Sequence, residues 1–129
     1  MKRLLLFVPV LAFAMATGCS TVSRVPCEGG AFAGDGLTPV ETVEISNTCW
    51  LFLACLPIAS GDVENPDGWT CSMFSDTATL ENQMKMLQAE ADRVGAKKAV
   101  NVTTLTTDED FFLFVFLRDK IHTSALLLK

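Results

Sequence analysis

Hydrophobic and polar positions alternate or cluster in ways that predict strands over much of the middle of the chain. Residues 38–46 alternate in part between apolar and polar side chains, which predicts a strand. A continuous apolar run over 49–58 predicts a buried strand ending near Pro57, although periodicity alone also allows a short helical turn. Residues 61–68, rich in Gly, Asp, Asn and Pro, have the composition of a loop.

The clearest helical pattern covers residues 79–94. Apolar side chains recur there every three or four residues on one helix face, at Leu80, Met84, Leu87, Ala91 and Val94. We expect this stripe to pack on the core rather than to line a cofactor pocket. Asp76, Thr77 and Thr79 offer side-chain oxygens for the N-cap, and Gly95 suits the residue just past the C-terminus.

The last third of the chain predicts three more strands. They cover 98–106, 111–117 and 121–128, joined by an acidic turn at 107–110 and a turn at 118–120. The run 111–117 is too short to span a membrane as a helix, so we expect a central strand buried on both faces. The fold class is therefore α+β, a small mainly antiparallel sheet packed against one amphipathic helix in the order β-β-α-β-β-β.

The N-terminus has a different character, because a basic pair precedes an apolar segment. Lys2 and Arg3 are followed by thirteen apolar residues, Leu4–Ala16, fewer than the roughly 20 that a membrane-spanning helix needs. This length fits the central region of a secretory signal peptide, so residues 1–18 are expected to be cleaved off. The alternative is an uncleaved anchor helix or a buried core helix.

The apolar segment ends in Ala16-Thr17-Gly18-Cys19, which resembles the lipobox of bacterial lipoproteins. The resemblance implies cleavage between Gly18 and Cys19, diacylglycerol on the Cys19 thiol, and a fatty acid such as palmitate on the new N-terminus. Ala16 departs from the Leu that most members of the family carry there. Ser20, in place of Asp, implies sorting to an outer rather than an inner membrane. Two or three acyl chains make a stable anchor, whereas one gives only reversible binding.

Cleavage of residues 1–18 changes the composition and charge of the chain that folds. The whole chain has 129 residues, a mean hydropathy of +0.35 and a net charge of −5. Without residues 1–18, eight basic and fifteen acidic residues remain, so the charge is −7. This charge argues against nucleic acid as a partner. Glycines over 19–36 indicate a flexible tether behind the lipidated cysteine, and 37–129 then form the globular α+β domain.

The helical region and the strand after it show a second, partial resemblance. The predicted helix from Leu80, the pair Gly95-Ala96 and the strand up to Val102 resemble TRL-like and YbjQ-like domains of small bacterial lipoproteins. The resemblance implies a compact α+β domain. It transfers no catalytic residue to this chain.

Four cysteines besides Cys19 are candidates for disulfides: Cys27, Cys49, Cys55 and Cys71. An even number of cysteines outside the cytoplasm favours disulfide bonds. We expect one structural disulfide, with Cys55–Cys71 favoured because these residues flank the loop, and Cys49–Cys71 second. The spacing does not fit a zinc site, and no CxxC redox motif is present.

Two polar groupings could carry chemistry. Asp62, Glu64 and Asp67 could bind calcium, although their spacing departs from an EF-hand and a solvated loop is the stronger interpretation. His122 and Ser124 share a face of a predicted strand, but no GxSxG motif surrounds the serine.

Aromatic residues cluster around the cysteine segment, at Trp50, Phe52, Trp69 and Phe74. Core packing is the favoured interpretation, and the lining of a pocket or an interface is the alternative. With no cofactor or catalytic signature, the sequence favours a lipid-anchored, non-enzymatic envelope protein that binds another envelope component or is purely structural. The alternative is an envelope enzyme or metal-binding module that uses His122, the spare cysteines or the acidic loop.

Overall fold

One antiparallel sheet dominates the computed structural model, which describes residues 20–27, 36–68, 70–111 and 115–129. Residues 1–18, for which the sequence predicts a signal peptide, lie outside the described residues, as do Cys19 and Trp69. The strands are β1 (Ser20–Pro26), β2 (Pro39–Phe52), β3 (Leu56–Gly61), β4 (Cys71–Met73), β5 (Lys98–Phe111) and β6 (Phe116–Leu128).

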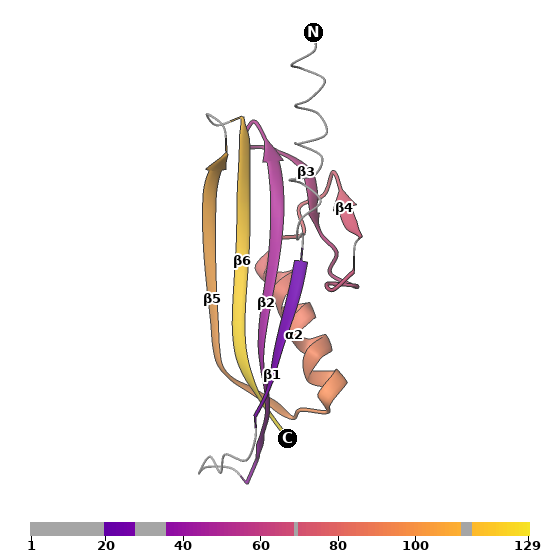
Figure 1. Ribbon diagram of the computed structural model, residues 1–129, viewed down its shortest axis with the longest axis vertical. Coiled ribbons are helices and arrows are strands. Elements are labelled where there is room, and N and C mark those ends of the chain that lie inside the picture. Colours follow the sequence, from indigo (N-terminus) through magenta and orange to yellow (C-terminus); the bar gives the residue numbers. More distant parts are fainter. Residues whose placement is uncertain (1–19, 28–35, 69, 112–114) are drawn as a thin grey trace.

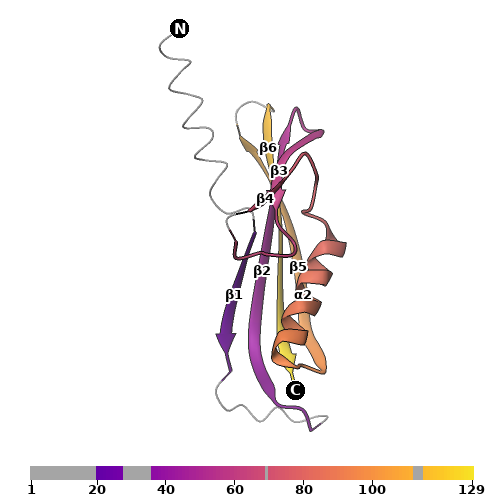
Figure 2. The same cartoon turned by 90° about the vertical axis from the view of Figure 1, so that its right-hand side faces the viewer.

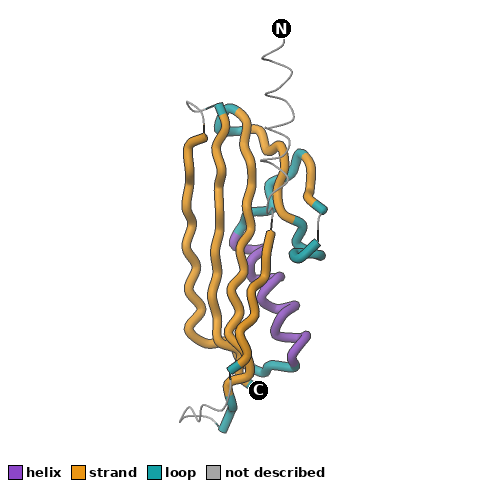
Figure 3. The backbone as a smooth tube through the Cα atoms, in the orientation of Figure 1, coloured by secondary structure: helices purple, strands orange, loops and turns teal. Residues whose placement is uncertain are grey.

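Strand order in the sheet is β4-β3-β2-β6-β5, and β1 also pairs with β2 (Figure 1). β6 pairs with β2 along its length, so β1 and β3 share the other side of β2. β1 lies opposite residues 41–47 of β2, and β3 lies opposite residues 49–52. The strands β2, β6 and β5, of 14, 13 and 14 residues, run side by side along the length of the sheet (Figure 3).

The one helix of the described chain, α2 (Leu80–Val94), lies along one face of the sheet against β2 and β6 (Figure 2). Its predicted ends are confirmed. The Thr79 side chain accepts a hydrogen bond from the Asn82 backbone, and Gly95 has the left-handed φ of 66° that favours glycine. No helix in the described ranges is both long and apolar enough to cross a bilayer.

The helix packs on the core through part of the predicted apolar stripe: Leu87 is buried in the core, and Ala91 and Val94 pack against it. The buried residues of the helix are Gln83, Met86, Leu87 and Glu90. Leu80 is 56% exposed, and Met84 is also exposed. The prediction was therefore wrong for Leu80 and Met84 only. It also did not include Gln83 and Glu90, which are buried because each has a hydrogen-bond partner on another element.

The core lies between α2 and alternate residues of the strands. Its members are Val22, Val43, Ile45, Met86, Leu87, Ala125 and Leu127. Odd-numbered residues of β2 from 41 to 49 and of β6 from 121 to 127 are buried, as strand alternation requires for one covered face. The sheet face opposite α2 is covered by no other helix or strand of the described chain.

Three predicted boundaries were wrong. The strands predicted at 38–46 and 49–58 are one continuous β2 followed by β3. The acidic residues 107–110 are inside β5, and 118–120 are inside β6, where Arg118 forms an ion pair with Glu109 across the two strands. The ion pair lets both charged groups remain in strands.

The run 111–117 does not form a central strand. Phe111 ends β5 and pairs with Phe116 at the start of β6, so this run contains the connection between the two strands. The mainly antiparallel sheet with one helix agrees with the α+β class, while the order over the described residues is β-β-β-β-α-β-β.

Candidate functional site

The segment that directly follows Cys19 is a strand and not a tether. β1 pairs with β2, and the Val22 side chain is part of the core. The Ser20 hydroxyl donates to the backbone oxygens of Asp62 (3.0 Å) and Pro66 (3.1 Å). The predicted tether is therefore corrected for residues 20–26, whereas 28–35 lie outside the described residues.

The physical reason for the correction is the alternation of side chains within β1. Ser20, Val22 and Arg24 alternate with Thr21 and Ser23, as in a half-buried strand. The glycines that indicated a tether come later, from Gly29 onwards. The alternation is one of burial, because Val22 is the single apolar residue among 20–24, so the sequence carries no alternating apolar pattern that predicts β1.

Charged side chains fasten β1 to the helix. Arg24 donates two hydrogen bonds to the carboxylate of Glu90, from Nε to Oε2 at 2.8 Å and from Nη2 to Oε1 at 2.7 Å. Its Nη1 donates to Asp67 Oδ2 at 2.8 Å. Arg93 completes the cluster, because it donates to Glu90 at 2.8 Å and to Glu41 on β2 at 2.6 Å. This ionic cluster joins β1, β2, α2 and the 62–68 loop.

Burial makes the ion pairs of this cluster stronger than an ion pair that is exposed to solvent. The side chain of Glu90 is 8% exposed and that of Arg24 is 31% exposed. The hydrogen bonds from Arg24 lower the pKa of Glu90 below its ordinary value, against the opposing effect of burial. The same bonds from Glu90 and Asp67 raise the pKa of Arg24. Bidentate pairing of this kind is strong and fixes orientation, so β1 is held in one register and position.

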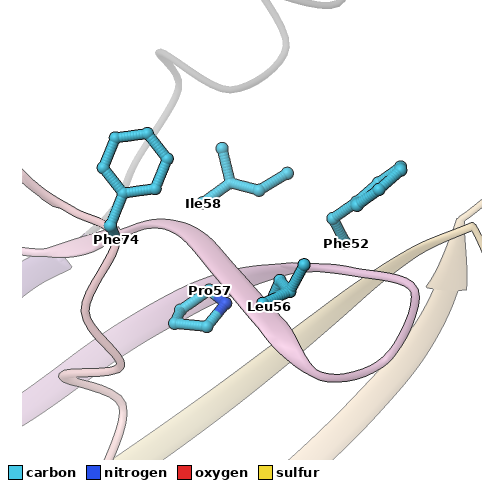
Figure 4. A pocket seen from close by; sticks show the side chains of 5 residues that line it. All are labelled: Phe52, Leu56, Pro57, Ile58 and Phe74. Carbon is cyan, nitrogen blue, oxygen red and sulfur yellow. The ribbon is translucent and has the colours of Figure 1, made fainter.

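An apolar groove lies at the other end of β2, where this strand turns into β3. Its volume is about 280 Å³, and it is lined by Phe52, Leu56, Pro57, Ile58 and Phe74. Phe74, Ile58 and Phe52 project to the same side of the backbone (Figure 4). The Phe74 backbone donates to the Ile58 carbonyl, which holds the two segments together. No polar side chain lines the groove, so it suits an apolar ligand or surface.

The aromatic residues of the sequence analysis separate into two environments. Phe52 and Phe74 line the groove, so the favoured core-packing role is wrong for them and the alternative, the lining of a pocket, describes them. Trp50 is buried and has the Arg118 guanidinium 5.7 Å from its ring centroid, so it belongs to the packed part of the sheet.

In the structure none of the four described cysteines is joined to another, and the strand register separates the two predicted pairs. Cys71 lies opposite Gly61. Gly61 is six residues along the chain from Cys55, so Cys55 and Cys71 are roughly 20 Å apart at about 3.3 Å per residue. Cys49 lies opposite Ser60, and Ser60 lies opposite Ser72, so Cys49 and Cys71 are two strands apart and point to opposite faces. A disulfide needs Cα atoms within about 7 Å. Cys27 lies beyond the end of β1, 3.6 Å from the Thr42 hydroxyl.

The acidic loop is organised by its own hydrogen bonds. Asp62 accepts from the backbone of Glu64 (2.9 Å) and from the Thr70 hydroxyl (2.7 Å), and these bonds lower the pKa of Asp62. Asp67 accepts from Arg24 and from the Val22 backbone. Over the residues that the structure describes, no group of three potential ligands is placed to hold a metal ion.

His122 and Ser124 lie two residues apart on β6, opposite Ser46 and Glu44 of β2. They are half-buried on the sheet face away from α2. Strand geometry thus brings them to one face, but no hydrogen bond joins them in the described structure. The pair lacks the contact through which a histidine activates a serine.

Comparisons with protein families, curated proteins and solved structures found no match to this chain.

Proposed function

We propose that this chain is a lipid-anchored cell-envelope protein, acylated at Cys19, sorted to an outer membrane, and acting there as a non-enzymatic binding or structural module. The observation that carries the proposal is the order of a basic pair, thirteen apolar residues, small residues and a cysteine within residues 2–19. The apolar groove, with no polar side chain in its lining, supports binding rather than catalysis.

The fastening of β1 supports the same proposal and refines it. An anchor on Cys19 would be followed at once by Ser20, whose hydroxyl is bonded to the 62–68 loop. The ionic cluster then holds Arg24 four residues later. In this proposal the domain is held directly against the membrane surface, because no free segment separates it from the lipid.

The test is incorporation of labelled palmitate into the full chain expressed in a bacterium with an outer membrane. We expect label in the wild type and none in Cys19→Ala, which should keep the precursor mass. Cys27→Ala is the matched control, since Cys27 is the next cysteine along the chain, and it should be labelled like the wild type. Normal labelling of Cys19→Ala would refute the proposal.

A further inference from the structure

Apolar side chains gather at the end of the sheet where β2, β3 and β4 meet. Phe74 is 78% exposed, Leu56 56%, and Leu53 and Met73 each 55%. Leu56 and Phe74 line the groove together with the half-buried Phe52 and Ile58, and Leu53 and Met73 are the chain neighbours of Phe52 and Phe74. These six residues are here named the apolar edge. A surface of this kind on an otherwise ordinary domain marks a site of interaction.

The chain enters the sheet close to the apolar edge. Ser20 is paired with Asn47, and its hydroxyl bonds to the loop that follows β3. β1 runs antiparallel to β2, so the chain before Ser20 comes from the side of the apolar edge. Trp50 lies level with Met73 across β3, and it is three residues beyond Asn47, the partner of Ser20. The distance along β2 from Ser20 to the apolar edge is therefore roughly 10 Å at about 3.3 Å per residue. This distance is less than the ~15 Å hydrocarbon depth of one bilayer leaflet.

Charged residues are missing from the segments that build the apolar edge. Residues 45–61 contain no Asp, Glu, Lys or Arg, and neither do residues 68–75. The charged residues level with this end of β2, such as Arg118 and Glu109, belong to the neighbouring strands β6 and β5, outside the apolar edge. A hydrocarbon phase tolerates such a surface, whereas each charged group moved into it would carry a large cost. The groove itself is lined by apolar residues only.

We propose that the apolar edge contacts the hydrocarbon of the same bilayer that holds the lipid on Cys19. The inference rests on the proposed lipid anchor. The anchor keeps the domain at the membrane, so the effective concentration of the apolar edge near the bilayer is high. The apolar edge therefore does not need to bind the bilayer by itself. Contact would fix the orientation of the domain on the membrane, with the far end of the sheet, near Pro39 and Leu128, turned away from it.

The experiment uses the full-length, lipidated protein purified from membranes and reconstituted in phosphatidylcholine vesicles. Cys55, exposed in the turn between β2 and β3, carries a bimane label in a Cys27→Ser, Cys71→Ser background. The matched control carries the label at Leu105→Cys with Cys55→Ser, since Leu105 on β5 is 59% exposed and remote from the apolar edge. Acyl chains brominated near the headgroup report contact with hydrocarbon, and aqueous iodide reports contact with water.

We expect lipid quenching at Cys55 and iodide quenching at position 105. Phe74→Glu should lower the ratio of molecules whose apolar edge contacts the bilayer to molecules whose apolar edge does not by about tenfold or more. The reason is that the free energy of transferring one Phe side chain out of water corresponds to a change of at least this factor in an equilibrium constant. Leu105→Glu should leave the ratio unchanged. Acylated, vesicle-bound protein whose Cys55 label is quenched by iodide alone would overturn the inference and leave the anchor standing. A label shielded from both quenchers would mean that protein covers the apolar edge, which also overturns the inference. A mass without acyl chains would instead overturn the anchor.

Discussion

Removing the Arg24 guanidinium tests whether the ionic cluster holds the segment behind Cys19 in place. In Arg24→Met, Glu90 loses two of its three charged hydrogen bonds and keeps only that from Arg93. Breaking a buried ion pair costs about 3–5 kcal/mol, whereas an exposed pair contributes about 0–1 kcal/mol. Because Arg24 is 31% exposed and Arg93 remains, we expect a loss of about 2–3 kcal/mol in the free energy of unfolding.

The assay is a double-mutant cycle measured by urea unfolding. Arg24→Met, Glu90→Gln and the double variant should give a coupling energy of about 2 kcal/mol. Lys85→Met is the control, because Lys85 pairs with the exposed Glu81 on the same helix and should leave the midpoint almost unchanged. A coupling below about 0.5 kcal/mol would refute the interpretation that Glu90 anchors β1.

The same pair predicts a pH dependence with a definite sign. Arg24 lowers the pKa of Glu90 below its ordinary 4.5 in the folded chain, so the stabilisation is complete above that value. It is lost as pH falls through the lowered folded pKa of Glu90. The stability difference between wild type and Arg24→Met should therefore be constant above the ordinary pKa of 4.5 and shrink as the pH falls below it. A difference that stays constant below this pKa as well would contradict a role for Glu90 ionisation.

Three further predictions concern the core, the helix and the thiols. Ile45→Ala should lower the unfolding free energy by about 2–5 kcal/mol, because Ile45 is fully buried. Leu105→Ala should change it by less than about 0.5 kcal/mol, because Leu105 is exposed. Equal effects of the two substitutions would contradict the assigned core. Thr79→Ala should cost about 1 kcal/mol by removing the N-cap acceptor of Asn82, and an unchanged melting temperature would show that the cap contributes nothing. In thiol titration of the native protein, Cys55 and Cys71 should react before the buried Cys49, and a Cys55–Cys71 disulfide found by peptide mapping would show the register to be wrong.

The sequence predicted α2 and the strand content well because those signals are local. Thr79 and Gly95 delimit the helix through hydrogen bonds and a φ angle that depend on a few neighbouring residues. The buried face of the helix was harder to predict, since Gln83 bonds to the Ile121 carbonyl and Glu90 to Arg24. Neither partner is near the helix in the sequence, so the apolar pattern identified Leu87, Ala91 and Val94 but not the two buried polar residues.

The candidate site was less predictable, because pairing register decides it. Spacing alone brought Cys55 and Cys71 together, whereas the register sets Cys71 opposite Gly61. The aromatic residues of the groove were noted, but their exposure depends on where β2 turns into β3. The ionic cluster was missed entirely, since its members come from four elements between residues 24 and 93.

Mass spectrometry of the N-terminal peptide from membrane-extracted protein tests the central claim most directly. The account predicts a peptide that begins at Cys19 and carries a diacylglyceryl thioether together with an amide-linked acyl chain. A peptide that begins upstream of Cys19, or an unmodified Cys19, would contradict it.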